Sequence, residues 1–291
     1  MIIYKYIDKY NIILGRYFFN NLNLLTYNLF NFFFKNFLFN KKSDYLKEFV
    51  NGGAQKVSKI PSKSIDELNN ILFLQEKKIK ENLNIGESYY DYEITPEIKE
   101  KVFDFLEGPL SKLVEELKKY YNTDIILSRI QIRRTFNTKS NKESYSNYFH
   151  VDGYICMLQK IFINLQDISK NHGPLRYIKK TDAKKILRTN KANINRIDKI
   201  DQEDLINHNV GQNGDVFLCN TTDLMHAAGV PTTGNKRDIL FLEICALPKR
   251  NSNLNINYNI FDRKVPNEDL TKIIAKPKGF KNLIKCFLRY Y

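Results

Sequence analysis

The stretch YFHVDG, residues 148–153, stands at the entrance to a run of residues with the composition of a β-strand. On extended backbone, side chains two positions apart point to the same side of the chain. His150 and Asp152 can therefore reach one metal ion from a single short segment. A His-x-Asp pair is common by chance, and taken alone it is explained equally well by a surface turn. Its interpretation depends on what the chain offers further on.

A second histidine lies in the stretch LMHAAGVP, residues 224–231, and Arg237 follows at the start of another apolar run. Two His and one Asp form the facial triad of non-haem Fe(II) oxygenases, which leaves the remaining coordination positions open. The guanidinium of Arg237 is planar and always charged, so it suits the far carboxylate of a dicarboxylate co-substrate. His150, Asp152 and His226 are therefore the candidate metal ligands and catalytic residues.

Strand-like runs surround these residues. Many short strands separated by Gly and Pro turns predict a β-sandwich or barrel. The expected strands are residues 125–136, 155–158, 160–166, 175–178, 216–219 and 237–247. Between them, residues 181–209 are expected to form a helix and loop, and residues 223–234 a loop.

Helix signals concentrate before residue 124. Ser64 and Glu67 have the spacing of a capping box, which predicts a helix start. Thr95-Pro96-Glu97 combines a capping residue, proline at the first helical position and an acidic residue. A further helix is expected from Leu110, and residues 41–63 are expected to be a loop. The predicted fold class is therefore mainly β with flanking helices, of the α+β type.

The chain divides by composition into three predicted segments: a helical, aromatic-rich N-terminal region over 1–85, a β domain with supporting helices over 86–250, and a basic C-terminal tail over 251–291. Within 10–40, apolar residues alternate with Asn and carry no signal-peptide pattern. The run is too interrupted to span a membrane, which takes about 20 apolar residues. An amphipathic helix covering the core is expected, and a peripheral membrane or partner contact is the alternative.

The net charge is +14, from 46 basic and 32 acidic residues. Such an excess favours an anionic partner, but here it is spread along the chain and accompanies no nucleic-acid-binding motif, so no specific nucleic-acid partner is expected. The four cysteines are Cys156, Cys219, Cys245 and Cys286, and none forms a C-x-x-C pair. Cys156, Cys219 and Cys245 lie in apolar strand-like runs and are expected to be buried thiols, and a reducing, cytoplasmic setting is expected. The oligomeric state is left open.

The order of the motifs resembles the phytanoyl-CoA dioxygenase family. The resemblance rests on His150-x-Asp152, on the stretch DISKNHGPL over residues 167–175, and on His226 with Arg237, and it spans roughly residues 90–250. It implies a double-stranded β-helix, a jelly-roll or cupin-like core. It also implies an oxidoreductase whose cofactors are Fe(II), 2-oxoglutarate as co-substrate and O₂.

By this resemblance His150, Asp152 and His226 bind iron and Arg237 binds the distal carboxylate of 2-oxoglutarate. Phe162 falls where the family places an aromatic ring beside the co-substrate. Gln131, on the preceding strand, is a weaker candidate for a second polar contact.

Two positions depart from the family pattern. Ala228 stands where a hydroxyl residue often contacts the same carboxylate, and Lys179-Lys180-Thr181 replaces the usual G-S-H. Asp152 is retained, whereas related halogenases lack that carboxylate. The resemblance therefore implies a dioxygenase that hydroxylates a C–H bond of a small-molecule, lipid or sugar-type substrate and releases succinate and CO₂. Residues 138–147 and 181–209 are expected to select the substrate.

Other interpretations stay open at this point. The chain could be a catalytically silent β-helix protein that binds a membrane surface or partner through its basic, aromatic termini. It could also be a cupin-like metalloenzyme that uses the same ligands without 2-oxoglutarate. Arg133-Arg134 fits either an anionic substrate or a solvated strand end. Turn or cap roles are expected for His172, Asp215 and Asp223.

Overall fold

The computed structural model describes residues 43–80, 88–137, 147–152, 158–182, 200, 202–222 and 224–247. The aromatic-rich segment before residue 43 and the basic tail after residue 247 lie outside the described residues. The same holds for most of the two segments expected to select the substrate. The predictions made for these segments, and the three-segment division of the chain, stay predictions.

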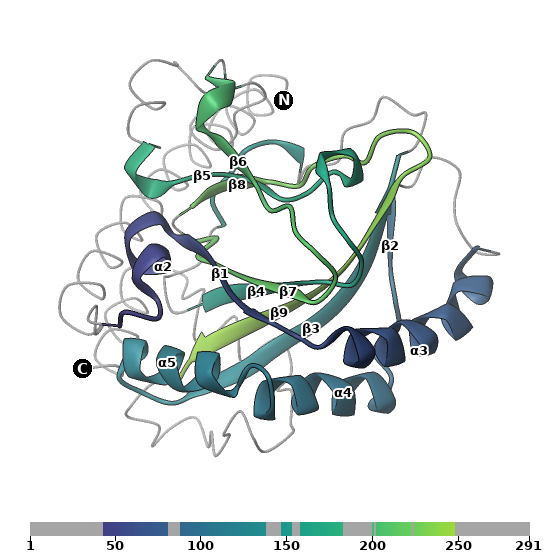
Figure 1. The fold of residues 1–291 in the computed structure, drawn as a ribbon, viewed down its shortest axis with the longest axis horizontal. Helices are drawn as coiled ribbons and strands as arrows, with labels where there is room; N and C mark the ends of the chain where they lie inside the picture. The colour runs from purple at the N-terminus through teal and green to yellow at the C-terminus, as the bar shows by residue number, and fades with distance from the viewer. Residues whose placement is uncertain are drawn as a thin grey trace, which may run out of the picture.

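Two antiparallel sheets form the centre of the structure (Figure 1). The larger sheet has six strands, which in spatial order are β1 (Ala54–Lys59), β7 (Asp215–Cys219), β4 (Leu158–Asn164), β9 (Lys236–Ala246), β3 (Ile125–Phe136) and β2 (Tyr89–Asp91). The smaller sheet has three, in the order β6 (Ile206–His208), β5 (Arg176–Ile178) and β8 (Met225–Ala227). With helices beside these sheets, the predicted class, mainly β with flanking helices, is confirmed.

Helices α3 (Ser62–Lys80), α4 (Pro96–Glu107) and α5 (Ser111–Tyr121) lie along one side of the larger sheet, and the smaller sheet lies on its other side (Figure 1). Helix α2 (Lys47–Gly52) lies at the edge of the larger sheet, beside β1 (Figure 1). The sequence signal at the start of α4 is confirmed, because the Thr95 hydroxyl accepts a hydrogen bond from the Ile98 N–H at 3.3 Å. Helix α3 begins two residues before the predicted capping box, immediately after Pro61.

Strand alternation gives the larger sheet two different faces. Ile132, Ile161 and Leu242 belong to the main apolar core, together with Val102 and Leu113 of the helices. The opposite face turns toward the smaller sheet and carries the aromatic and charged side chains described below. Because successive residues of a strand point to opposite faces, one set of strands builds both the core and the site.

Three strands lie where the sequence predicted loops. Helix α2 and strand β1 occupy the segment 41–63, and β1 pairs with β7 from Ala54↔Cys219 to Lys59↔Asp215. Strands β6 and β8 lie within the other two predicted loop segments. These predictions were wrong because each of these strands is short and is stabilised by a partner distant in sequence, which local patterns do not report.

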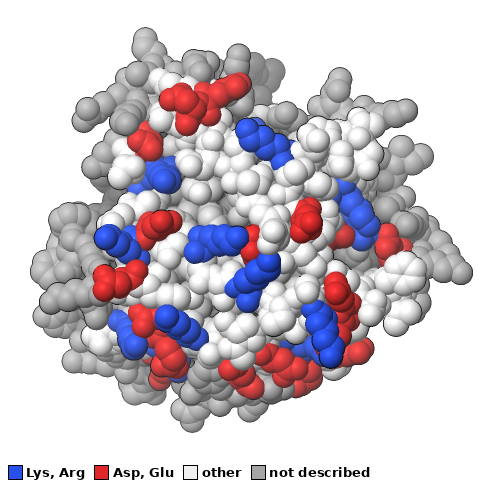
Figure 2. Space-filling model, viewed as in Figure 1, with Lys and Arg blue, Asp and Glu red and all other residues white. Residues whose placement is uncertain are grey.

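The described surface has a mixed charge. Figure 2 shows basic and acidic side chains interspersed over this face of the molecule. Among the described residues, no helix has both the length and the apolar character needed to cross a membrane.

Candidate metal centre

His150 and His226 are held together by their own backbones. They form an isolated antiparallel bridge in which each N–H donates to the carbonyl of the other at 2.9 Å. The two imidazole rings lie with their centroids 4.4 Å apart. The Asp152 N–H donates to the Thr221 carbonyl at 2.8 Å. Backbone hydrogen bonds therefore fix the two segments, far apart in sequence, in one register.

One carboxylate oxygen faces both imidazoles. Asp152 Oδ1 lies 3.7 Å from Nε2 of His150 and 3.9 Å from Nε2 of His226. Two neighbouring ligands of a facial triad, each about 2.1 Å from the ion, lie about 3 Å apart, so each side chain needs to move inward by less than about 1 Å to share a metal. All three candidate ligand atoms lie within 4.8 Å of one another. The residue types and their spacing therefore fit a divalent ion.

The other ring nitrogen of each histidine fixes the tautomer. Nδ1 of His150 lies 2.8 Å from the Tyr148 carbonyl, and Nδ1 of His226 lies 2.9 Å from the Leu224 carbonyl. A carbonyl oxygen only accepts, so each Nδ1 carries the proton and each Nε2 presents its lone pair. Such a contact orients a metal-binding imidazole and raises its basicity.

The protonation states also suit metal binding. Burial lowers the pKa of His226 to about 4, although the nearby Asp152 carboxylate opposes the shift. Burial opposes ionisation of Asp152, but the charge of Lys160 and the partial charge of His226 outweigh it and hold the pKa of Asp152 well below its usual range. At neutral pH His226 is thus neutral and Asp152 is ionised, as metal coordination requires.

The three residues line a cavity of about 170 Å³ between the two sheets. Aliphatic and aromatic side chains make up much of its wall. The other residues of the wall are Arg133, Lys160, Phe162, Leu175, Ala228, Arg237, Ile239 and Phe241.

Arg237 places a buried positive charge in this cavity. The residue is 6% exposed, and its side-chain hydrogen bond among the described residues is a long contact of 3.5 Å from Nη2 to the Thr135 hydroxyl. Nε and Nη1 have no hydrogen-bond partner among the described residues. Burial, and to a lesser extent repulsion from Arg133, lowers the pKa of Arg237 to about 10, so it stays charged at neutral pH. A buried guanidinium with free donors is costly unless an anion binds it.

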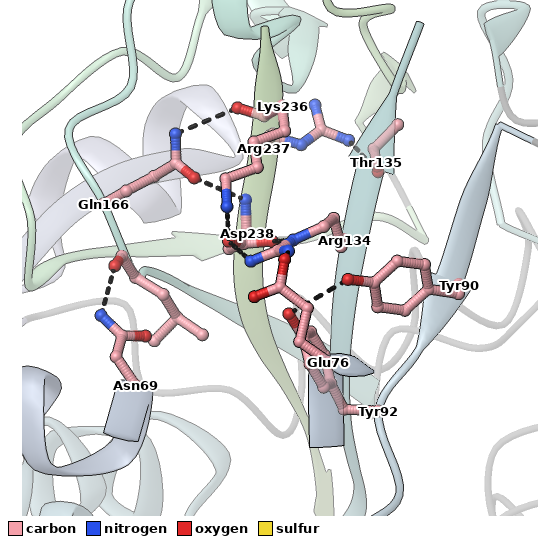
Figure 3. Close-up of polar contacts among 11 residues, drawn as sticks. Asn69, Glu76, Tyr90, Tyr92, Arg134, Thr135, Gln166, Lys236, Arg237 and Asp238 are labelled. Carbon is pink, nitrogen blue, oxygen red and sulfur yellow. Dashed lines mark hydrogen bonds and ion pairs between the residues drawn. The ribbon is translucent and has the colours of Figure 1, made fainter. Parts of the chain in front are cut away.

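The neighbouring pair on the opposite face is fully satisfied. Figure 3 shows Arg237 turned toward Thr135, whereas Asp238 meets Arg134. Arg134 donates from Nε and Nη2 to the two oxygens of Asp238 at 2.6 and 2.7 Å, and from Nη1 to Glu76 of α3. Arg134 is therefore a structural residue, and the interpretation of this residue as a solvated strand end or substrate contact was wrong.

The other two polar candidates, Arg133 and Gln131, both donate hydrogen bonds to Asp91 of β2. Arg133 donates to both Asp91 oxygens at 2.6 and 2.9 Å and lies over the Tyr89 ring at 4.0 Å. Gln131 Nε2 donates to Asp91 Oδ2 at 2.6 Å, and Gln131 does not line the cavity. The structure thus brings Phe162 and Arg237 to the candidate ligands but leaves Gln131 outside.

Lys160 was missed by sequence reasoning. It lies on β4 with its Nζ 2.7 Å from Asp152 Oδ2 and 3.8 Å from Glu243 Oε1. Its only sequence signal is a single charged residue inside the otherwise uncharged strand LQKIFIN, residues 158–164.

Two other predicted roles are confirmed. His172 closes a turn, because its Nδ1 accepts from the Ser169 N–H at 3.0 Å. Asp215 Oδ2 accepts from the Gln212 N–H at 2.8 Å within the turn before β7. Asp223 lies outside the described residues. Cys219 and Cys245 are buried free thiols, as expected.

The sequence matches no protein-family model and no curated protein. The structure is similar to that of HygX from Streptomyces hygroscopicus, solved with nickel and 2-oxoglutarate bound, at 15% identity over 70% of this chain and 87% of that chain, with a TM-score of 0.47. It is also similar to the epimerase SnoN, solved with Fe³⁺, alpha-ketoglutarate and nogalamycin RO, at 8% identity over 69% and 82%, TM-score 0.49. The non-heme monooxygenase ThoJ shares 12% identity over 85% and 96%, TM-score 0.49. At these values the similarity establishes neither a shared family nor a shared activity.

Proposed function

We propose that this protein is an Fe(II)- and 2-oxoglutarate-dependent oxygenase. The observation that carries the proposal is the presence of His150, Asp152, His226 and the buried guanidinium of Arg237 in one small cavity. In this proposal the two sheets are the halves of a double-stranded β-helix, as the resemblance to the phytanoyl-CoA dioxygenase family implies.

The charges of the cavity support a dianionic co-substrate. Lys160 is balanced by nearby Glu243, and Arg133 is balanced by Asp91. Metal-bound imidazoles carry no charge, so a divalent ion, the Asp152 carboxylate and the Arg237 guanidinium leave a net charge of about two positive units in a largely buried space. Uncompensated charge of this size is costly in a protein interior. 2-Oxoglutarate carries two negative charges and neutralises this excess positive charge.

Each residue has a defined task in the proposed reaction. The three ligands hold iron from one side and leave positions for the co-substrate and O₂. When bound, iron supplies the oxygen chemistry that couples decarboxylation of the co-substrate to oxidation of a C–H bond. Arg237 binds the far carboxylate through its free donors and so orients the co-substrate. Phe162 and Phe241 exclude water from that position.

The cavity is small for the primary substrate. Its volume of about 170 Å³ lies below the range of about 300–1,000 Å³ that is usual for ligand pockets. In this proposal the cavity holds the co-substrate, and the primary substrate lies at its mouth. We propose a small-molecule, lipid or sugar-type substrate that is hydroxylated with release of succinate and CO₂. A cytoplasmic location with a peripheral membrane contact by the N-terminal segment belongs to the same proposal.

Arg237 also separates this proposal from its competitors. A cupin-like metalloenzyme that uses the triad alone has no need of a buried guanidinium in the same cavity whose Nε and Nη1 have no partner among the described residues. A silent binding protein needs neither a neutral His226 beside an ionised Asp152 nor imidazoles that are oriented by backbone carbonyls. The 2-oxoglutarate oxygenase is the function that uses all of these features.

The test is formation of succinate from 2-oxoglutarate in air with Fe(II), without primary substrate, because such enzymes turn over the co-substrate slowly in its absence. We expect the wild-type protein to form succinate and His226→Ala to fall to the background of iron alone. His172→Ala, which removes a histidine outside the cavity, is the matched control and should retain activity. Equal succinate formation by wild-type protein and His226→Ala would refute the proposal.

A further inference from the structure

We propose that Lys160 is a positioning residue that limits Asp152 to a single metal-binding oxygen. The inference concerns the metal centre of the proposed function and rests on it. Its test, however, includes a measurement on the metal-bound protein without 2-oxoglutarate, so the two can fail separately.

The geometry divides the two oxygens of Asp152 between different partners. Oδ1 faces the Nε2 atoms of His150 and His226 at 3.7 and 3.9 Å. Oδ2 accepts a hydrogen bond from the Lys160 ammonium at 2.7 Å. An ion placed between the imidazoles therefore meets Oδ1, while Oδ2 is already engaged by a charge-assisted hydrogen bond.

Lys160 is itself held in place. Its side chain is 17% exposed, and on β4 it is the direct register partner of Glu243 on β9. Glu243 Oε1 lies 3.8 Å from the Lys160 ammonium. Because both neighbours are carboxylates on hydrogen-bonded backbone, the ammonium is held close to both.

The pairing with Glu243 explains how a cation is tolerated beside a metal. An unbalanced ammonium close to a divalent ion would weaken metal binding by several kcal/mol, even at an effective dielectric constant of about 20. Glu243, whose side chain is 7% exposed, offsets that repulsion. Lys160 can therefore hold Oδ2 without opposing the ion that Oδ1 binds.

The number of Asp152 oxygens that bind the ion determines how many of its coordination positions stay open. A six-coordinate ion bound by two imidazoles and one oxygen keeps three positions for other ligands. If Asp152 bound through both oxygens, only two would remain. A chelating 2-oxo acid fills two, so the third position, which O₂ needs, exists only when Asp152 uses one oxygen. Lys160 thereby preserves the oxygen position.

The experiment counts metal-bound water in the Mn(II)-loaded protein by the relaxation of water protons, with bound Mn(II) measured by electron paramagnetic resonance. Wild-type protein should show three exchanging waters without 2-oxoglutarate and one with it. Lys160→Met should show two exchanging waters without 2-oxoglutarate and none with it. Its relaxivity per bound Mn(II), measured before 2-oxoglutarate is added, should therefore be about a third lower than that of the wild-type protein. Lys160→Arg, which keeps a charged donor, should retain the wild-type relaxivity.

A second variant guards against a folding defect. Lys160→Met leaves Glu243 without its nearby ammonium, so the double variant Lys160→Met/Glu243→Met removes both charges and should show the same one-water loss. Unchanged relaxivity in both Met variants, or an equal loss in Lys160→Arg, would overturn the proposal. If 2-oxoglutarate changes no relaxivity while the one-water difference persists, the co-substrate assignment fails and the role of Lys160 stands.

Discussion

Replacing Arg237 with methionine should have opposite effects on stability and on co-substrate binding. In the metal-free protein without 2-oxoglutarate, the guanidinium is buried and makes one long hydrogen bond to the part of the chain that the structure describes. Its pKa is lowered from 12.5 to about 10, chiefly by burial. At neutral pH the group is charged in both the folded and unfolded states, and the lowered pKa means that folding disfavours the charged form by about 3 kcal/mol.

Methionine retains an apolar stem of similar length and carries no charge. Arg237→Met should therefore raise the free energy of unfolding of the empty protein, by up to about 3 kcal/mol. Loss of the 3.5 Å contact to Thr135 subtracts little from this gain, because a hydrogen bond that long is weak. The measurement is urea denaturation at neutral pH with a chelator present.

The same substitution should weaken 2-oxoglutarate binding to the Mn(II)-loaded protein. A buried carboxylate that loses its cationic partner costs about 3–5 kcal/mol, which corresponds to at least about 100-fold in Kd. Calorimetric titration of both proteins measures the difference. If Arg237→Met is less stable than the wild-type protein, or binds 2-oxoglutarate within a few-fold of it, the interpretation of Arg237 as an unsatisfied anion receptor is refuted.

Three further predictions follow from the same structure. Arg134→Met is the matched control for Arg237→Met. It should lower the free energy of unfolding, measured by urea denaturation, by about 3–5 kcal/mol, because the buried Asp238 carboxylate loses both hydrogen bonds from Arg134. The metal-free protein should lose about 2 kcal/mol of stability between pH 7 and pH 5, because the His226 imidazole takes up a proton near pH 6.5 when unfolded but only near pH 4 when folded. His226→Asn should lack that part of the pH dependence, and an unchanged slope would contradict the assignment. Thr95→Ala should cost about 1 kcal/mol by removing the cap of α4, again by urea denaturation, and no loss would mean that the cap is unimportant.

The sequence contains local signals for much of the fold and for the three candidate ligands. Spacing two apart on extended backbone places His150 and Asp152 on one side without any knowledge of the tertiary structure. Thr95 identifies the start of α4 because a cap and the bond it makes lie within one turn. Long apolar strands such as β3 and β9 are evident for the same reason: their pattern is contained in their own residues.

The remaining features depend on partners far away in the chain. Strand β1 exists because β7 pairs with it, and three-residue β8 exists because β5 does. Arg134 resembles a solvated strand end until Asp238, 104 residues later, is placed opposite it. Lys160 looks like an unexplained charge in an otherwise uncharged strand until Asp152 and Glu243, from two other segments, are placed beside it. Such roles arise from the register of the sheets and are not present in any single stretch.

The most direct measurement is an anomalous difference map, recorded at the iron absorption edge, from crystals grown without oxygen in the presence of Fe(II) and 2-oxoglutarate. The account predicts one strong peak about 2.1 Å from Nε2 of His150, Nε2 of His226 and Oδ1 of Asp152, with the far carboxylate of 2-oxoglutarate on Arg237. A peak bound by other residues, or a fully folded protein with no iron between these three, would contradict it.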